Sequence, residues 1–188
     1  MQMPSDFNNV QAFTSFETLE PGAHVCVVKK IEECKSSTGK DMIRIYLDTH
    51  VSDRQPNFYE KKFKEDTRET KKWGCIVYQL VLDAKGNTNR GFKTFIECLE
   101  QSNNFKVEWG NAFATSIQGK LIGGVFGREE YQNSYGESKF AIKCFNFRTV
   151  QDVKSGMVKV PNDRLLSPSN GFSGFDGITP VDDGEMPF

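Results

Sequence analysis

Apolar and polar side chains alternate most clearly in residues 43–48. Ile43, Ile45 and Leu47 fall on one side of an extended chain, and the other side carries Arg44, Tyr46 and Asp48. A period of two with one apolar face predicts a half-buried strand. A β-rich run over residues 24–34 precedes it, and the polar sequence SSTGK between the two predicts a hairpin loop.

The middle of the chain has a less decisive pattern. Residues 57–73 mix charged and aromatic side chains and fit part strand and part loop, while the apolar run CIVYQLVL at 75–82 fits a buried strand or a short helix. We expect a helix over residues 92–100, because one helical stripe is formed there by Phe92, Phe95, Ile96 and Leu99. A second, short helix is expected over residues 111–117.

The last regular pattern predicts a curved pair of strands. Residues 119–131 form a long strand in this interpretation, and its glycines at 123, 124 and 127 permit bulges and strong bending. A turn at 133–137 leads to a partner strand over residues 138–150. One face of that strand is expected to carry Phe140, Ile142 and Cys144, and the other Lys139, Lys143, Phe145 and Phe147.

This order of elements predicts a mainly β protein. Curved antiparallel strands with a helix before the last hairpin favour an oligonucleotide-binding (OB) fold, a five-stranded Greek-key barrel with a helix between strands 3 and 4. We divide the chain into an N-terminal arm (1–20), the barrel domain (21–160) and a tail (161–188). The tail is rich in Pro, Ser, Asn, Gly and Asp without any period, so we expect it to be disordered.

Charge separates the body from this tail. The 188 residues carry a net charge of −1, but residues 161–188 hold five acids and one base, which gives −4. The preceding 160 residues hold 23 bases and 20 acids, which gives +3. A mildly basic body with an acidic tail indicates separate binding partners for the two parts.

Several classes of protein are disfavoured by what the chain contains. Its five cysteines are widely spaced without a CxxC pair, and it has only two histidines, so we expect no disulfide framework, no metal site and no cofactor. Nucleotide-binding loops and hydrolase motifs are lacking, which argues against an enzyme. No apolar run is long enough to span a bilayer, and residues 1–10 lack a signal-peptide pattern, so we expect a cytoplasmic protein.

The end of the chain carries the most specific motif. Its acidic and apolar residues lead to a terminal Pro-Phe and comprise Asp182, Asp183, Gly184, Glu185, Met186, Pro187 and Phe188. This ending resembles the C-terminal tip of bacterial single-stranded DNA-binding proteins. A terminal Phe offers a ring and a carboxylate together, which a basic partner pocket can bind. The resemblance implies that replication, recombination or repair proteins dock on this tip.

The body is similar to phage-encoded relatives of those proteins from Gram-positive hosts. The similarity runs from about residue 19 to 161 through LEPGAHV, KKFKEDT, VYQLVLD, GKLIGGVFGREEY and FNFRTV. It implies a non-enzymatic protein that coats single-stranded DNA in the cytoplasm or nucleoid of a bacterial host. The long section 57–104 departs from the familiar bacterial protein, so the usual tetramer does not carry over and homo-oligomerisation stays open.

Binding single strands without sequence preference requires cations for phosphates and aromatic rings for bases. The first stacking candidates are Phe58, Tyr59 and Trp73, and the cations around them are Lys61, Lys62, Lys64, Arg68, Lys71 and Lys72. The outward face of the second strand adds Arg44 and Tyr46. The final hairpin adds Arg128, Tyr131, Tyr135, Lys139 and Lys143. Two alternatives remain at this point: a metal-dependent nuclease or other DNA-processing enzyme, and an adaptor that binds no DNA.

Overall fold

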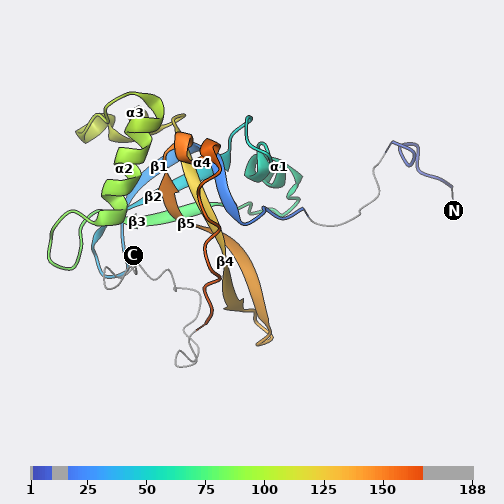
Figure 1. Cartoon of the computed structure of the whole chain (residues 1–188). Coiled ribbons are helices and arrows are strands. Elements are labelled where there is room, and N and C mark those ends of the chain that lie inside the picture. The colour runs from blue at the N-terminus through green and yellow to red at the C-terminus, as the bar shows by residue number, and fades with distance from the viewer. Residues whose placement is uncertain (1, 10–16, 167–188) are drawn as a thin grey trace.

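The computed structural model describes residues 2–9 and 17–166 and is mainly β. Five antiparallel strands form one sheet in the order β3-β2-β1-β4-β5. The strands are β1 (Gly22–Lys35), β2 (Asp41–Thr49), β3 (Ile76–Leu80), β4 (Leu121–Gln132) and β5 (Ser138–Arg148) (Figure 1). The helices are α1 (Phe58–Glu65), α2 (Arg90–Asn103), α3 (Phe113–Ile117) and α4 (Val150–Ser155), with a 3₁₀ turn at Gly110–Ala112.

β1 is the central strand, and a bulge at Lys29 divides it. The register shows the bulge, because Val28 lies opposite Leu47 and Lys30 lies opposite Tyr46, the residue next to it. Before the bulge β1 pairs with both β4 and β2, and after it with β2 alone. The extra residue lets both Val28 and Ile31 face the core. Lys30 and Glu32 consequently face outward.

The sequence pattern located most elements correctly. The predicted strands at 24–34 and 43–48 are β1 and β2, and the ambiguous run at 75–82 contains the strand β3. The predicted helix at 92–100 is part of α2, and its apolar stripe is buried. The Asn89 side chain caps α2 by accepting hydrogen bonds from the backbone N–H groups of Gly91 and Phe92. The short helix expected at 111–117 is the 3₁₀ turn followed by α3.

Residues 57–73 differ from the expectation of strand and loop, since they contain the helix α1. The residue before this helix, Asn57, makes no side-chain cap. β2 supplies the cap instead, because the N–H groups of Tyr59 and Glu60 donate to the Asp48 carboxylate at 2.8 and 3.3 Å. The N–H of Phe58 donates to Thr49 Oγ1 at 2.9 Å. A tertiary contact therefore satisfies the first turn of α1, and Asp48 is buried rather than exposed on the outer face of its strand.

β5 also departs from simple alternation. Val125 pairs with Asn146 and Phe126 with Cys144, so Phe145 is an extra residue in the ladder. The bulge turns Phe147 into the core, where its ring lies 5.0 Å from that of Phe95. The expectation that Phe147 shares a face with Lys143 was therefore wrong. β5 ends at Arg148 rather than 150, since Thr149 begins α4 with a capping box.

The glycines of β4 allow close approach of neighbouring groups. A Cβ on Gly123 would lie 2.5 Å from Val153 Cγ2 of α4 and 2.8 Å from the Arg148 carbonyl oxygen. A Cβ on Gly127 would overlap the Phe145 ring. The glycines thus serve packing against β5 and α4, and the bulge itself belongs to β5.

The sheet is open in hydrogen-bonding terms, so strand pairing does not close the predicted five-stranded barrel. Within residues 2–9 and 17–166, no ladder joins the edge strands β3 and β5. α2 packs against both of these strands and against β4, with Phe95 and Leu99 fully buried in the core. Helix packing, rather than strand pairing, therefore connects the two edges.

Both predicted boundaries of the body lie inside packed structure. In the predicted arm, Leu19 belongs to the core, and Gln55 Nε2 donates to the Thr18 carbonyl oxygen at 3.1 Å. The buried His24 ring lies 2.8 Å from Asp53 Oδ1 and 2.9 Å from the Glu20 carbonyl oxygen. These contacts hold the chain entering β1 against the loop after β2.

Residues 161–166, the start of the predicted tail, line the free edge of β4. β1 pairs with β4 only as far as Phe126, while β4 continues to Gln132 as a projecting hairpin with β5 (Figure 1). The Arg164 N–H donates to the Arg128 carbonyl oxygen at 2.9 Å, and the Glu130 N–H donates to the Arg164 carbonyl oxygen at 2.8 Å. The rest of the predicted tail, 167–188, lies outside the described residues.

Replacing Asp48 by Ala should lower the free energy of unfolding by about 2 kcal/mol, because buried N–H groups of α1 lose their acceptor. Asp41→Ala is the matched control, since this exposed carboxylate pairs with Lys35 at the start of β2 and should contribute less than about 1 kcal/mol. Urea denaturation of both variants measures the difference. Equal losses would contradict the role assigned to Asp48.

Candidate nucleic-acid interface

The outward side of the first three strands gathers cations and aromatic rings. Cross-strand pairing places Lys30 opposite Tyr46, Glu32 opposite Arg44, and Arg44 opposite Tyr78. Residues paired directly across a ladder lie on the same face of a sheet. We call this surface the β1–β2–β3 face and define it as Lys30, Glu32, Arg44, Tyr46 and Tyr78.

Rings and cations touch one another on this face. Lys30 Nζ lies 5.7 Å from the centre of the Tyr46 ring, and the Arg44 guanidinium carbon lies 5.7 Å from the centre of the Tyr78 ring. Such cation–π contacts hold the flexible basic side chains beside the rings. The face therefore presents two half-buried aromatic rings with a positive charge next to each.

Glu32 is the acid at the middle of the face. Its Oε1 lies 2.6 Å from Lys30 Nζ, and its Oε2 accepts a hydrogen bond from the Tyr46 hydroxyl at 2.7 Å. The hydrogen bonds from Lys30 and then Tyr46 lower the pKa of Glu32 below its ordinary value. The same carboxylate raises the pKa of Tyr46. Glu32 is thus held ionised and Tyr46 protonated at neutral pH.

The aromatic residues predicted to stack on bases in residues 57–73 have other positions. Phe58 and Tyr59 are core residues at 5% and 6% exposure, so neither ring offers an open face and both stacking assignments are corrected. Their helix turns these side chains inward, which an extended segment would not do. Trp73 is half-buried, packs against Phe63 and donates from Nε1 to the Leu47 carbonyl oxygen at 2.7 Å.

The cations of the same region remain at the surface. Lys61 and Lys72 are exposed, and Lys62 is half-buried with Nζ 4.8 Å from the Phe58 ring centre. Lys64 pairs with Glu60 at 2.7 Å, and Arg68 pairs with Asp66 at 2.7 Å. Lys71 Nζ lies 5.7 Å from the Phe63 ring centre. The region provides positive charge, largely without exposed rings.

The β1 bulge connects these cations to the β1–β2–β3 face. Lys29, the extra residue, pairs with Glu60 of α1 at 2.9 Å, while the next residue, Lys30, lies on the face. The two basic surfaces therefore meet at this point of β1.

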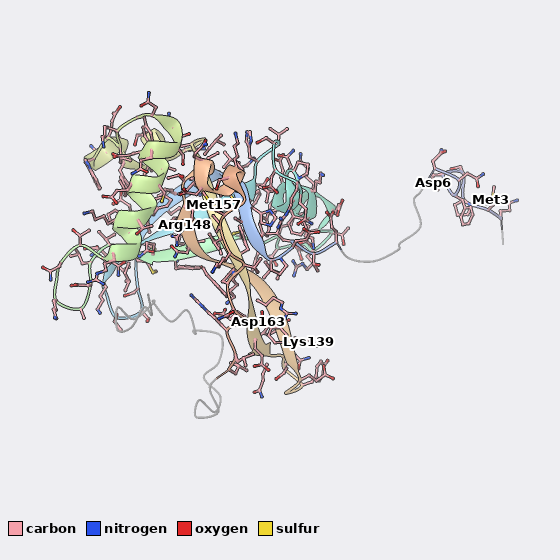
Figure 2. The ribbon with its side chains drawn as sticks, in the orientation of Figure 1. Met3, Asp6, Lys139, Arg148, Met157 and Asp163 are labelled. Carbon is pink, nitrogen blue, oxygen red and sulfur yellow. The ribbon has the colours of Figure 1, made fainter. Side chains whose placement is uncertain are left out.

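The predicted hairpin residues lie along the projecting part of β4 and β5. Tyr131 and Tyr135 are exposed, and Tyr135 is 87% exposed at the turn. Three acids pair with the basic residues, in the pairs Arg128–Asp163, Lys139–Glu137 and Lys143–Glu129. Figure 2 shows Lys139 on β5 and Asp163 on the segment that follows the hairpin edge. The hairpin is thus rich in aromatic side chains but locally neutralised.

Sequence reasoning missed three residues of interest. Lys30 and Tyr78 complete the β1–β2–β3 face, and alternation within β3 gave no signal for Tyr78, because it shares its face with the apolar Ile76 and Leu80. Trp109, between α2 and α3, is 63% exposed and stacks on Phe113 with ring centres 5.5 Å apart. No pattern marked Trp109, because its exposure depends on the 3₁₀ turn that begins beside it.

Other predicted features fall outside the description or give no site. The tip residues 182–188 lie outside the described residues. Among the residues that are described, no group of three or more His, Cys, Asp or Glu side chains is placed to hold a metal ion. None of the described helices is long and apolar enough to cross a bilayer. Comparison with models of known protein families and with curated proteins finds no match for the chain.

The electrostatics of the face can be measured directly. The Glu32 carboxyl should titrate below the ordinary glutamate range, and Lys30→Met should raise its pKa towards that range by removing the strongest hydrogen bond. Because the folded-state pKa is the lower one, ionised Glu32 stabilises the fold above the ordinary range and loses this effect as the pH falls. Side-chain carboxyl NMR over an acid titration tests this, and an ordinary pKa in the unmodified protein would contradict it.

Proposed function

We propose that this chain is a non-enzymatic, sequence-independent single-stranded DNA-binding protein with an OB fold. The strand connectivity supports the fold assignment, because β1 pairs with both β2 and β4, β2 with β3, and β4 with β5. α2 lies between β3 and β4 in the chain, as in that fold. OB folds are partly open barrels, so a sheet without a ladder between β3 and β5 is compatible with the class.

The β1–β2–β3 face is the observation that carries the proposal. OB folds bind oligonucleotides on the face of strands 2 and 3, between the loops that follow strands 1 and 4. Arg44 and Tyr46 of β2 and Tyr78 of β3 are outward-facing residues of those strands. Rings stack on bases of any sequence, and the adjacent cations attract phosphates, which is the chemistry of non-specific single-strand binding.

The neighbouring surfaces extend this binding path. The cations of α1 and the segment after it adjoin the face through Lys29. Two exposed hairpin rings provide further platforms, Tyr131 near the end of β4 and Tyr135 in the turn between β4 and β5. A path over several surfaces suits a protein that coats a strand rather than one that reads a short motif.

The biological role follows from the two parts of the chain. The body would protect single strands exposed in phage or bacterial replication, recombination and repair. The acidic tip, Asp182–Phe188, would recruit partner proteins through its terminal ring and carboxylate. The setting would be the cytoplasm or nucleoid of a bacterial host.

Tyr46→Leu should weaken binding to oligo-dT about tenfold by removing one stacking platform, and adding Tyr78→Leu should weaken it further. Tyr46→Phe keeps the ring and loses only the hydroxyl that bonds Glu32, so it should weaken binding less than Tyr46→Leu does. Fluorescence anisotropy with labelled oligo-dT over a range of salt concentrations measures both affinity and salt dependence. The affinity should fall as salt rises, because phosphate contacts release counterions.

Three results would contradict the proposed function. Equal affinity for duplex and single strand would remove the single-strand assignment. Turnover of labelled DNA with Mg²⁺ or Mn²⁺ would identify a DNA-processing enzyme. Absence of DNA binding, with partner capture through the tip retained, would identify an adaptor.

Deleting Met186–Phe188 should leave oligo-dT affinity within about twofold, since the tip carries no phosphate-binding cation. The same deletion should abolish capture of host replication or repair proteins in a pull-down. Deleting Ser167–Ser169 is the matched control, because it shortens the tail equally and keeps the tip. Capture that survives loss of the tip would refute its docking role.

A further inference from the structure

Two hydrogen-bond donors and one further cation of the β1–β2–β3 face surround one carboxylate. Lys30 Nζ and the Tyr46 hydroxyl contact the two oxygens of Glu32 at 2.6 and 2.7 Å. Arg44 NH1 lies 3.8 Å from Oε2, which is an ion pair but too long for a hydrogen bond. The donors come from β1 and β2, and the Tyr46 and Tyr78 rings adjoin the cations.

This arrangement has the composition of a phosphodiester site. Carboxylate and phosphate oxygens accept the same charge-assisted hydrogen bonds from Lys, Arg and hydroxyl donors. In a single strand each backbone phosphate lies next to bases that can stack on rings. A Glu between two basic residues and two rings therefore occupies the place where an incoming phosphate would find its donors.

We propose that the Glu32 carboxylate stands in for a backbone phosphate in the free protein, at a phosphate subsite formed by Lys30, Arg44 and Tyr46. The inference rests on the proposed DNA binding and adds to it a defined phosphate position and a residue that limits affinity. DNA enters this subsite by displacing the carboxylate from its donors.

Two features make the carboxylate displaceable. The Glu32 side chain is 31% exposed, and exposed ion pairs contribute little net stability because water screens them. Arg44 makes no hydrogen bond to Glu32, since its NH1 lies 3.8 Å from Oε2, and its side chain is 41% exposed. The guanidinium therefore retains capacity for a second anion.

The proposed subsite implies that Glu32 weakens DNA binding. Each phosphate that binds there meets the negative charge of Glu32 as well as the cations. Removing that charge while keeping the side-chain shape should raise affinity and strengthen the release of counterions on binding. A purely structural Glu32, which positions Lys30 and Tyr46 for DNA, would give the opposite sign.

The test compares Glu32→Gln with Glu33→Gln in the full-length chain, by anisotropy with labelled oligo-dT from low to high salt. Glu33 is the matched control, because it is the next residue on β1, is exposed, and lies opposite Ile43 on the other side of the sheet. Glu32→Gln should bind about threefold to tenfold more tightly at low salt. Its log–log salt slope should steepen by about 0.7 for each further phosphate that the protein neutralises.

Glu33→Gln should change affinity by less than about twofold, since its side chain lies on the opposite face of the sheet from Lys30, Arg44 and Tyr46. Unchanged or weaker binding by Glu32→Gln, or an equal increase in affinity in both variants, would overturn the proposal while the unmodified protein still binds DNA. Failure of the unmodified protein to bind oligo-dT would instead reject the proposed function.

A second measurement avoids any substitution. On saturation with oligo-dT, the Glu32 carboxyl signal in NMR should move towards that of an unpaired glutamate, because Lys30 and Tyr46 transfer to the phosphate. A Glu32 signal that keeps its free-protein titration in the complex would also overturn the subsite.

Discussion

The single extra residue in β1 is the constraint on which the rest of the molecule depends. Without the bulge at Lys29, strict alternation after Val28 would turn Lys30 and Glu32 into the core and Ile31 out to solvent. With it, Ile31 packs with Val28 and Ile45 inside, and the two charged residues reach the outer face. Lys29 itself contacts Glu60 of α1. Core packing and the proposed binding surface are therefore two results of one irregularity.

Polar contacts between segments far apart in the sequence hold α1 beside the sheet. Asp48 and Thr49 at the end of β2 cap α1, which buries Phe58 and Tyr59 beside the sheet. Burial raises the pKa of Asp48, although backbone N–H donors from Tyr59, Thr49 and Glu60 oppose the rise. The rings of this region thus stabilise the fold, and its lysines remain for the surface.

Many basic residues on the outer surfaces are paired with acids and do not form an open basic patch. Acids contact Lys30 on the face and Arg128, Lys139 and Lys143 on the hairpin. Exchange of these acids for phosphates would make binding depend on salt and keep it reversible. The segment at 163–166 supplies one of these acids. Asp163 forms an ion pair with Arg128, and the backbone of its neighbour Arg164 forms a bridge with Glu129 of β4.

Local sequence determined the strands β1 and β2, the helix α2 and the turn before β5, because their periodicity and turn residues act within a few positions. It also located Arg44 and Tyr46 on an outward face. Tertiary structure alone decided that 57–73 contains a helix, since its cap comes from β2, and that Phe147 lies inside, since a bulge shifts the register. Tertiary structure also decided the β1–β2–β3 face, because Lys30, Arg44 and Tyr78 meet only when three separate strands pair.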